Sequence, residues 1–263
     1  VIEPMVLGSA SVGGSFYAYG DALAKVLSED LNTSVENSPS GGSVANTRLL
    51  HNNEIDLGLL QSRFAGMARN STAMFEGEEP YTDLRIIASI FTFTNVTYVL
   101  KDSGITKFTD LKGKKIGLGP DPEVFDESAR PSFEAHGFDY DNDIERIYAS
   151  KDDIYRLFGD GSIDAVSEDL GGLQADPALL QIASTKDVLI LGYDKELMEK
   201  AGVPVAMIPE GSVAGAAGDT WAYKMGAVVF ATTNRMSDDV VYLITKALHE
   251  NLETIAQLTP EAL

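Results

Sequence analysis

Residues 40–62 read SGGSVANTRLLHNNEIDLGLLQS, a glycine turn, a helix and a buried strand in immediate succession. The glycine pair 41–42 interrupts the chain, and Ser43 stands where a helix can begin. A short, mostly apolar run at residues 55–60 then has the character of a strand in the interior of a sheet. The stretch predicts a helix followed by a strand, the repeating unit of α/β folds.

The same order of elements appears again on both sides of this stretch. Residues 5–27 predict a strand, a glycine loop and a helix, and residues 111–137 predict a strand that ends in glycine and a helix closed by Gly137. Residues 152–166, DDIYRLFGDGSIDAV, repeat the helix and the strand, with Ile-Asp again opening the strand. The repetition predicts two similar α/β lobes.

Three further elements complete the predicted framework. Residues 84–90 and 95–100 predict two separate strands. Residues 237–255 predict one long helix, with Ser237 as its N-cap and an apolar stripe along one face.

The first lobe is expected to comprise residues 1–97 and 230–263, and the second lobe residues 98–229. Strands that alternate with helices imply mostly parallel sheets, and such sheets bind ligands just beyond the carboxyl ends of their strands. Four loops stand at that edge and are expected to border one cleft between the lobes: those after Leu7, before Ser43, after Leu60 and after Leu118.

The composition excludes several classes of function. Forty acidic residues against twenty basic ones give a net charge of −20, which disfavours binding to nucleic acid and to anionic membrane surfaces. No apolar run is long enough to insert into a membrane. The chain has no cysteine, its three histidines are scattered, and it lacks the motifs of zinc and nucleophile sites. We expect no catalytic residue, no metal ion and no cofactor.

Two glycine loops are candidate binding sites for a small ligand. In the loop GSASVGGSFYAYG at residues 8–20, backbone N–H groups and hydroxyls at the mouth of the helix can face a ligand, although the glycines could equally serve only to turn the chain. In the second loop, the amides of the first helical turn after Gly42 suit a carboxylate, and Asn46 lies one turn further along the helix. In the alternative interpretation, Ser43 only caps the helix and Asn46 faces solvent.

A polar pair ends the apolar run of residues 55–60. Gln61 and Ser62 reach over the edge of the sheet, where an amide that both donates and accepts suits a zwitterion or an acid, whereas a structural Gln61 would bond loop backbone. Arg63 is either a fork for a carboxylate or one partner of a surface ion pair, and the ion pair is the favoured interpretation.

Six segments together resemble the TAXI branch of the TRAP-transporter solute receptors over residues 5–252: GSASVGGSFYAYG, SGGSVANTRLL, IDLGLLQS, DSGITKFTDLKGKKIGLG, GSIDA and VVYLITKALHEN. The resemblance implies a two-lobed type II periplasmic-binding-protein fold that closes, without catalysis, around a small organic acid or amino acid such as glutamate, glutamine or a related dicarboxylate. It implies a periplasmic or extracytoplasmic protein, its signal peptide removed, that delivers the ligand to a TRAP membrane permease. We expect a monomer. The same lobes could instead report a ligand to a kinase or chemoreceptor.

The second lobe departs from the pattern of this family. Where the family usually has Gly-Ser-Gly-Thr at the start of a helix, this chain has Pro122-Glu123-Val124-Phe125. Fixed carboxylates there would repel a second acid group, so we expect a ligand with one acid end and an amino or apolar far end. The predicted ligand contacts are Ser9, Ala10, Gly14, Ser15, Tyr17, Gly41, Gly42, Ser43, Asn46, Gln61, Ser62, Glu123, Val124, Phe125 and Glu168.

Overall fold

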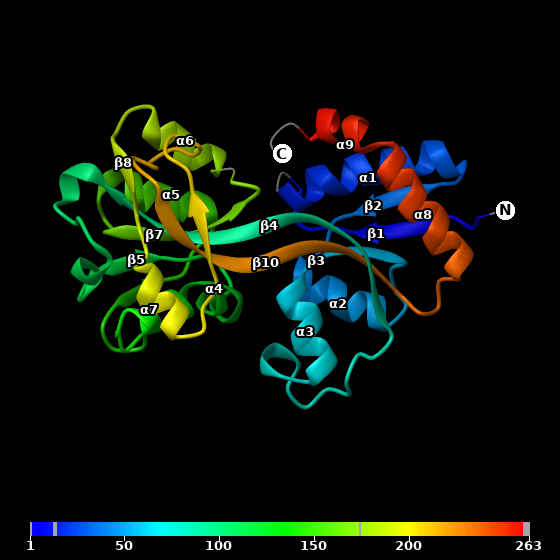
Figure 1. Cartoon of the computed structure of the whole chain (residues 1–263), viewed down its shortest axis with the longest axis horizontal. Helices are drawn as coiled ribbons and strands as arrows, with labels where there is room; N and C mark the ends of the chain where they lie inside the picture. Colours follow the sequence, from blue (N-terminus) through cyan, green and yellow to red (C-terminus); the bar gives the residue numbers. More distant parts are fainter. Residues whose placement is uncertain (1, 13–14, 174, 260–263) are drawn as a thin grey trace. The chain divides into compact units, whose positions relative to one another are not determined.

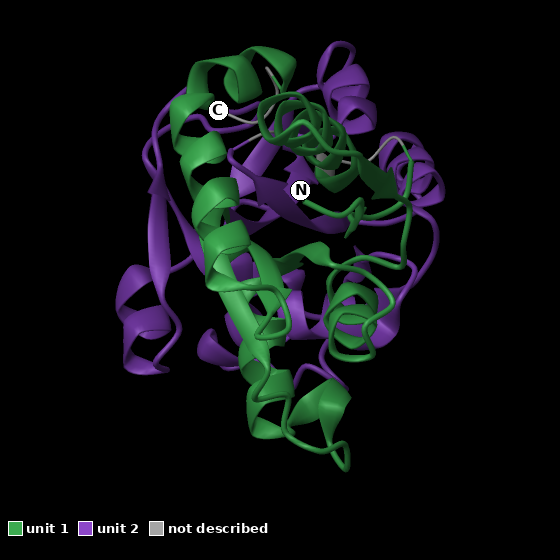
Figure 2. Cartoon of the chain, turned by 90° about the vertical axis from the view of Figure 1, so that its right-hand side faces the viewer, with its two compact units in different colours: residues 1–92, 226–263 green, residues 93–225 purple. Residues whose placement is uncertain are grey.

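The computed structural model describes residues 2–12, 15–173 and 175–259, which fold into two compact units. Unit 1 comprises residues 1–92 and 226–263, and unit 2 comprises residues 93–225 (Figure 2). The chain passes from one unit to the other within two long strands, β4 (Leu84–Leu100) and β10 (Thr220–Thr233) (Figure 1). Both covalent links between the units are therefore strands rather than loops.

Unit 1 is built around a short parallel sheet. Its elements are β1 (Met5–Gly8), α1 (Ser15–Leu31), β2 (Val35–Ser38), α2 (Ser43–His51), β3 (Leu57–Gln61), α3 (Ser62–Asn70), the 3-10 turn η1 (Ala73–Phe75), α8 (Asp238–Glu250) and α9 (Leu252–Leu258). β1 pairs in parallel with β2 and β3, and β10 joins β3 in the antiparallel sense, giving the order β2-β1-β3-β10. The carboxyl ends of β1, β2 and β3 therefore meet at one edge.

The core of unit 1 explains why β3 is almost entirely apolar. Leu57, Leu59 and Leu60 are all fully buried, as expected for a strand covered on both faces. α1 packs against β2 and α8, and α2 packs against β3. Leu7 of β1 and Phe230 of β10 are likewise fully buried, so apolar burial fixes the two strands on either side of β3.

Unit 2 is a mixed sheet with helices on both faces. Its elements are η2 (Lys101–Ser103), η3 (Phe108–Leu111), β5 (Lys115–Gly117), α4 (Pro122–Ala135), β6 (Glu145–Ile147), α5 (Lys151–Asp160), β7 (Ala165–Gly171), α6 (Pro177–Ala183), β8 (Val188–Leu191), α7 (Lys195–Lys200) and β9 (Val205–Ile208). β5 pairs in parallel with β6 and β7, β7 and β8 pair antiparallel with β4, and β9 pairs antiparallel with β10. The carboxyl ends of β5, β6 and β7 form the corresponding edge of this unit.

Two apolar clusters hold unit 2 together. One contains Tyr98, Tyr155 and Phe158 and gathers side chains of α5 and α6. The other contains Phe108 and Phe133, whose rings lie 4.7 Å apart and tilted, and gathers side chains of α4 and α7. A sheet covered in this way on both faces is a rigid support for the loops at its edge.

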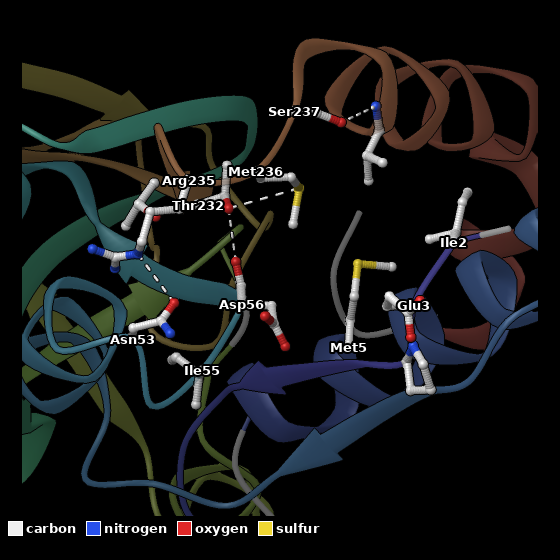
Figure 3. Close-up of a pocket in the computed structure, with 13 residues that line it drawn as sticks. Ile2, Glu3, Met5, Asn53, Ile55, Asp56, Thr232, Arg235, Met236 and Ser237 are labelled. Atoms are coloured by element: carbon white, nitrogen blue, oxygen red, sulfur yellow. Dashed lines mark hydrogen bonds between the residues drawn. The ribbon is translucent and has the colours of Figure 1, made fainter.

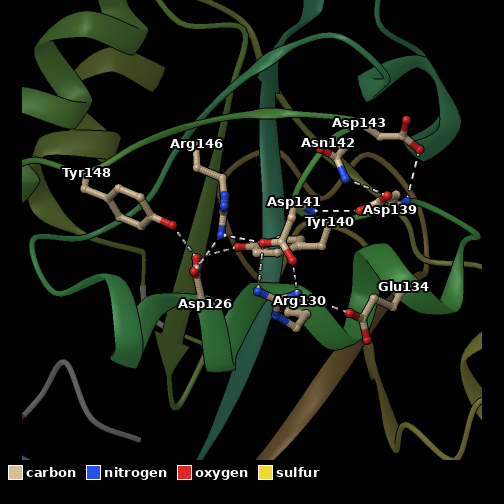
Figure 4. Close-up of polar contacts among 10 residues, drawn as sticks. All are labelled: Asp126, Arg130, Glu134, Asp139, Tyr140, Asp141, Asn142, Asp143, Arg146 and Tyr148. Carbon is tan, nitrogen blue, oxygen red and sulfur yellow. Dashed lines mark hydrogen bonds and ion pairs between the residues drawn. The ribbon is translucent and has the colours of Figure 1, made fainter.

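A polar network fixes α4, the helix that begins at the edge of unit 2 (Figure 4). The ring of Tyr140 lies between the guanidinium groups of Arg130 and Arg146, at 4.5 and 5.1 Å from its centroid. Its hydroxyl donates to Asp126 at 2.9 Å, and Tyr148 donates to the same carboxylate oxygen at 2.7 Å. Burial, and then the nearby Asp126 carboxylate, raise the pKa of Tyr140, so the phenol stays protonated and remains a donor.

The structure corrects two predicted elements. The strands predicted at residues 84–90 and 95–100 are one continuous strand, β4, because the intervening residues 91–94 are aromatic and β-branched and contain no turn former. The long helix predicted at residues 237–255 is two helices that meet at Asn251, whose side chain donates to the carbonyl of Ala247 and competes with the helix backbone. The Ser237 cap is confirmed, since its side chain accepts from the Val240 N–H.

Candidate binding site

Three helices of unit 1 begin at the edge where its parallel strands end. β1 leads to α1 at Ser15, β2 leads to α2 at Ser43, and β3 leads directly to α3 at Ser62. The first turn of a helix has amide groups without helical partners and carries roughly half a positive charge. Helix amino ends at a common sheet edge form a surface suited to an anion.

The amide groups that open α2 and α3 are not capped by side chains. The N-cap of α2 is Gly42, at φ 81°, and the N-cap of α3 is Gln61. The prediction that Ser43 caps α2 is wrong, because Ser43 lies one residue inside the helix and its hydroxyl accepts instead from the Gln61 N–H at 3.1 Å. The side-chain oxygen of Gln61 accepts from Arg63 Nε at 2.8 Å, so one contact of Arg63 lies within its own loop.

Asn46 ties the loops of this edge together from beneath. Its side chain is fully buried, and Nδ2 donates to the carbonyls of Gly8, Ser9 and Leu59 at 3.1, 2.7 and 2.7 Å. The interpretation in which Asn46 faces solvent is therefore wrong. One amide holds the end of β1, the loop after it, and β3 at fixed distances from α2.

The remaining predicted residues of unit 1 line the same loops. Ser9 is fully buried and its hydroxyl donates to Ser38 O at 3.4 Å, while the Ala10 carbonyl accepts from Ser40 N at 3.3 Å. The Tyr17 carbonyl accepts from Asn37 Nδ2. Gly41 is exposed, and the hydroxyl of Ser62 accepts from the Ala227 N–H at 3.2 Å. Ser15 is described only as the first residue of α1, and Gly14 lies outside the described residues.

In unit 2, side chains of the protein itself cap the helices that begin at the corresponding edge. Asp121 caps α4, and its Oδ1 accepts from the amides of Glu123 and Val124 at 3.1 and 3.4 Å. Ser150 caps α5 and Asp176 caps α6 in the same way. Of the three predicted residues in this segment, Glu123 is exposed, while Val124 and Phe125 are partly buried. Oxygen atoms of the chain thus already fill the anion positions of this edge.

Phe125 and Glu168 lie beside a small cavity in unit 2. The ring of Phe125 lies so close to the backbone that a Cβ added at Gly119 would be 2.0 Å from it. Glu168 is buried at 5% exposure, and its two oxygens accept from Lys151 Nζ at 2.7 Å and from Tyr155 OH at 2.6 Å. Burial raises the pKa of Glu168, and Lys151 opposes that shift.

Sequence reasoning missed Asp169, the carboxylate next to Glu168. Its Oδ1 accepts from Asn95 at 2.8 Å and its Oδ2 from Ser128 at 2.9 Å, so neutral donors hold it at the carboxyl end of β7. The signal was present in the alternation of strand side chains, which puts Ser167 and Asp169 on one face and Glu168 on the other. The hydrogen bond from Asn95 Nδ2 to Ser167 Oγ confirms that shared face.

A second hollow in unit 1 lies at the opposite end of the strands (Figure 3). It has a volume of about 300 Å³ and lies where β1 and β3 begin, beside Met5 and Asp56. The Asp56 backbone carbonyl accepts from Thr232 Oγ1, and its carboxylate accepts from the Val6 N–H. Those contacts bind the sheet to itself. The amino end of α8 also borders this hollow through Ser237 and Val240, but none of the predicted ligand contacts lines it, so it is not the predicted site.

Two features of the described residues concern other kinds of site. Among them no group of three or more histidine or acidic side chains is placed to hold a metal ion. Within residues 2–12, 15–173 and 175–259, no helix has both the length and the apolar character needed to cross a membrane.

Comparison with known proteins gives one family and one fold. The model of a family described as the NMT1-like family matches residues 7–262. Similar solved structures include an ABC-transporter periplasmic substrate-binding protein from Coxiella burnetii (15% identity, TM-score 0.55, 98% of each chain covered) and an arginine-transport periplasmic binding protein from Legionella pneumophila (14%, 0.55, 100% of each). A third is the GluR0 ligand-binding core from Nostoc punctiforme in complex with L-glutamate (14%, 0.56, 99% of each). At these identities the likeness concerns the fold, and the predicted type II periplasmic-binding-protein fold is confirmed.

Proposed function

The chain belongs to the NMT1-like family, and from that membership we propose that it is a solute receptor that captures a small organic acid or amino acid for a membrane transporter. The TAXI-like segments of the sequence favour a TRAP-type permease as the partner and a periplasmic or other extracytoplasmic location. In this proposal the receptor binds and releases its ligand unchanged, without a catalytic residue or a cofactor.

The contrast between open and occupied helix ends supports the proposal. α2 and α3 of unit 1 begin without a side-chain cap, whereas Asp121 and Asp176 cap α4 and α6 of unit 2. An open helix end attracts an anion, while a carboxylate cap more than offsets the half charge of its helix. A ligand carboxylate is thus favoured at unit 1 and disfavoured at unit 2.

This polarity defines the ligand class. A second acid group near Asp121 or Glu123 would meet a repulsion of about 1 to 4 kcal/mol at partly hydrated separations of a few ångströms. We therefore favour a ligand with one acid end and an amino or apolar far end over a plain dicarboxylate. In this arrangement the amides of residues 43–45 and 62–64 contact the acid group, and Phe125 faces the far end.

The proposal divides the predicted contacts into two roles. Ser9 and Asn46 are fully buried, so they act by holding the loops in place, and the exposed backbone at Gly41 acts directly on the ligand. Ligand contacts to both units would favour a closed state, with β4 and β10 as the hinge strands. The same closure would serve a sensor that reports the ligand to a kinase or chemoreceptor. A kinase gene next to the gene of this protein would favour the sensor, and a gene for a multi-span permease would favour transport.

Proline substitution tests the role of the α2 amides directly. Proline is tolerated in the first turn of a helix and removes one N–H without adding a charge. Val44→Pro deletes an amide of this turn, and Val44→Ala is its matched control because it truncates the same side chain and keeps the amide. Loss of a hydrogen bond to a charged group, about 1.5 to 3 kcal/mol, predicts about 10- to 150-fold weaker binding for Val44→Pro.

The ligand is first identified by a thermal-shift screen of amino acids, dicarboxylates and keto acids, since saturation at a hundredfold over Kd adds about 2.7 kcal/mol of stability. Calorimetry then measures the affinity of both variants for the best compound. Equal affinities for Val44→Pro and Val44→Ala would exclude the α2 amides from the site. A wild-type protein that binds no compound of the panel would contradict the receptor function itself.

A further inference from the structure

An ion pair with an unusual position lies inside unit 2. Glu168 projects from β7 and is buried at 5% exposure, and Lys151 Nζ lies 2.7 Å from its Oε1. The Lys151 side chain is 41% exposed, so its stem runs along the surface while its ammonium reaches inward. The buried acid is thus paired with a cation that has a path to solvent.

The position of Lys151 is not explained by its helix. Lys151 is the first residue of α5, where the positive end of the helix disfavours a cation. Two carboxylates hold it there: Glu168 at 2.7 Å and Asp176 at 4.0 Å. Burial lowers the pKa of Lys151, but the charge of Glu168 more than offsets this and raises it on balance, so the ammonium stays charged.

The space around this ammonium suits a cation. A small cavity adjoins it, with a volume of about 10 Å³ while the Lys151 side chain is in place, and is lined by Leu118, Gly119, Phe125, Lys151, Ile154, Tyr155, Val166, Ser167 and Glu168. Phe125 and Tyr155 contribute aromatic rings to its lining. Tyr155 also donates to Glu168 Oε2 at 2.6 Å, which orients the carboxylate. With the Lys151 side chain withdrawn, the cavity would contain one carboxylate and no cation.

We propose that this cavity is a subsite for a primary ammonium group, occupied by Lys151 in the free protein and entered by the amino group of a ligand when Lys151 turns out to solvent. The exchange replaces one ammonium by another, so Glu168 keeps a partner throughout and no buried charge is left unpaired. Lys151 then sets the specificity of unit 2. The inference rests on the proposed function for the identity of the ligand and adds the chemistry of its far end.

Chemical rescue tests the cavity without any knowledge of the ligand. Lys151→Ala removes the ammonium and its stem, leaves Glu168 without a cationic partner and lowers the melting temperature. Methyl-, ethyl- and propylammonium chloride should restore the melting temperature in a saturable manner, with the best compound set by chain length. Sodium chloride and tetramethylammonium chloride at equal ionic strength should not, because neither supplies N–H donors of a primary ammonium.

Three further variants make the result specific. Lys151→Ala with Glu168→Gln keeps the space but removes the charge, and it should not respond to the amines. Lys112→Ala breaks an exposed ion pair with Asp143 and should also not respond. Lys151→Gln serves if Lys151→Ala folds poorly, because it keeps a neutral donor. An absence of amine rescue in both Lys151→Ala and Lys151→Gln overturns the proposal. Equal rescue in the double variant of Lys151→Ala with Glu168→Gln also overturns it.

The ligand itself separates this inference from the proposed function. For the compound identified by the screen, the ratio of the affinity for the amine-bearing form to the affinity for its deaminated analogue is measured in each protein. This ratio should be at least tenfold larger in Lys151→Ala than in the wild type. Amine rescue in a protein that binds no compound of the panel would keep the subsite and remove the receptor function. Ligand binding by the wild type without amine rescue would keep the receptor function and remove the subsite.

Discussion

Replacement of Asn46 by aspartate would show whether one buried amide holds together the edge of unit 1 where its parallel strands end. Asn46 Nδ2 donates to three carbonyls at 2.7–3.1 Å, and the residue is fully buried. Asn46→Asp preserves the shape of the side chain but places an oxygen where three oxygens already converge. The variant must either leave a carboxylate buried among acceptors or bind a proton.

The size of the effect follows from the hydrogen bonds and from proton linkage. Asn46 Nδ2 carries two N–H groups, which the three carbonyls share, so loss of these donors costs about 2 kcal/mol at about 1 kcal/mol each. Burial among carbonyls raises the pKa of the introduced carboxyl in the folded state, whereas the unfolded chain releases the proton near pH 4. Above that pH the unfolded state binds fewer protons, so stability falls as pH rises, by about 1.4 kcal/mol per unit until the folded pKa is reached.

Urea denaturation at pH 5, 6 and 7 measures this difference against the wild type, which cancels the other titrating groups. If the folded pKa lies above 7, the deficit of Asn46→Asp grows by about 2.7 kcal/mol from pH 5 to pH 7. Asn70→Asp, at the exposed end of α3, is the matched control and should show a constant difference. A deficit for Asn46→Asp that does not change with pH would refute the assignment of this amide as a buried donor.

Three further predictions concern unit 2. Asp121→Ala removes the α4 cap, lowers the free energy of unfolding by about 1 kcal/mol and strengthens dicarboxylate binding in calorimetry; unchanged stability would argue against the cap. Gly119→Ala lowers the melting temperature because its Cβ would be 2.0 Å from the Phe125 ring, and a second change, Phe125→Leu, should restore most of the loss. Burial lowers the pKa of His136, so the unfolded state takes up the proton first and stability falls as pH drops below about 6.5; the stability profile of His136→Gln should be flatter there.

The sequence predicted those parts of the fold that local patterns determine. The apolar run that became β3 and the serine that caps α8 at Ser237 follow from composition and spacing within a few residues. The prediction that Ser43 caps α2 was wrong for a comparably local reason, since a shift of one residue moves its hydroxyl from the N-cap position to the first turn. That offset depends on Gly42 adopting φ 81°, which no neighbouring residue dictates.

The hydrogen-bond and ion-pair partners at the carboxyl ends of the parallel strands could not be predicted, because they depend on tertiary contacts. Asn46 meets carbonyls 37 and 38 residues earlier in the chain and one 13 residues later. Lys151 and Glu168 are 17 residues apart, on a helix and on the strand after it. A polar residue near a sheet edge has the same sequence signature whether it faces a ligand or anchors a loop, and only its burial separates the two roles.

The two units show how one α/β pattern can be given opposite electrostatic preferences with few residues. A helix end carries about half a positive charge, so a cap without charge leaves it attractive to an anion, and an aspartate cap leaves a net negative end. Gly42 and Gln61 provide the first case in unit 1, and Asp121 and Asp176 provide the second in unit 2. The strands and helices need not change for this difference, because N-cap residues lie outside the buried core. The charge at these helix ends can therefore change at the N-caps alone, without cost to the packing that holds the sheet together.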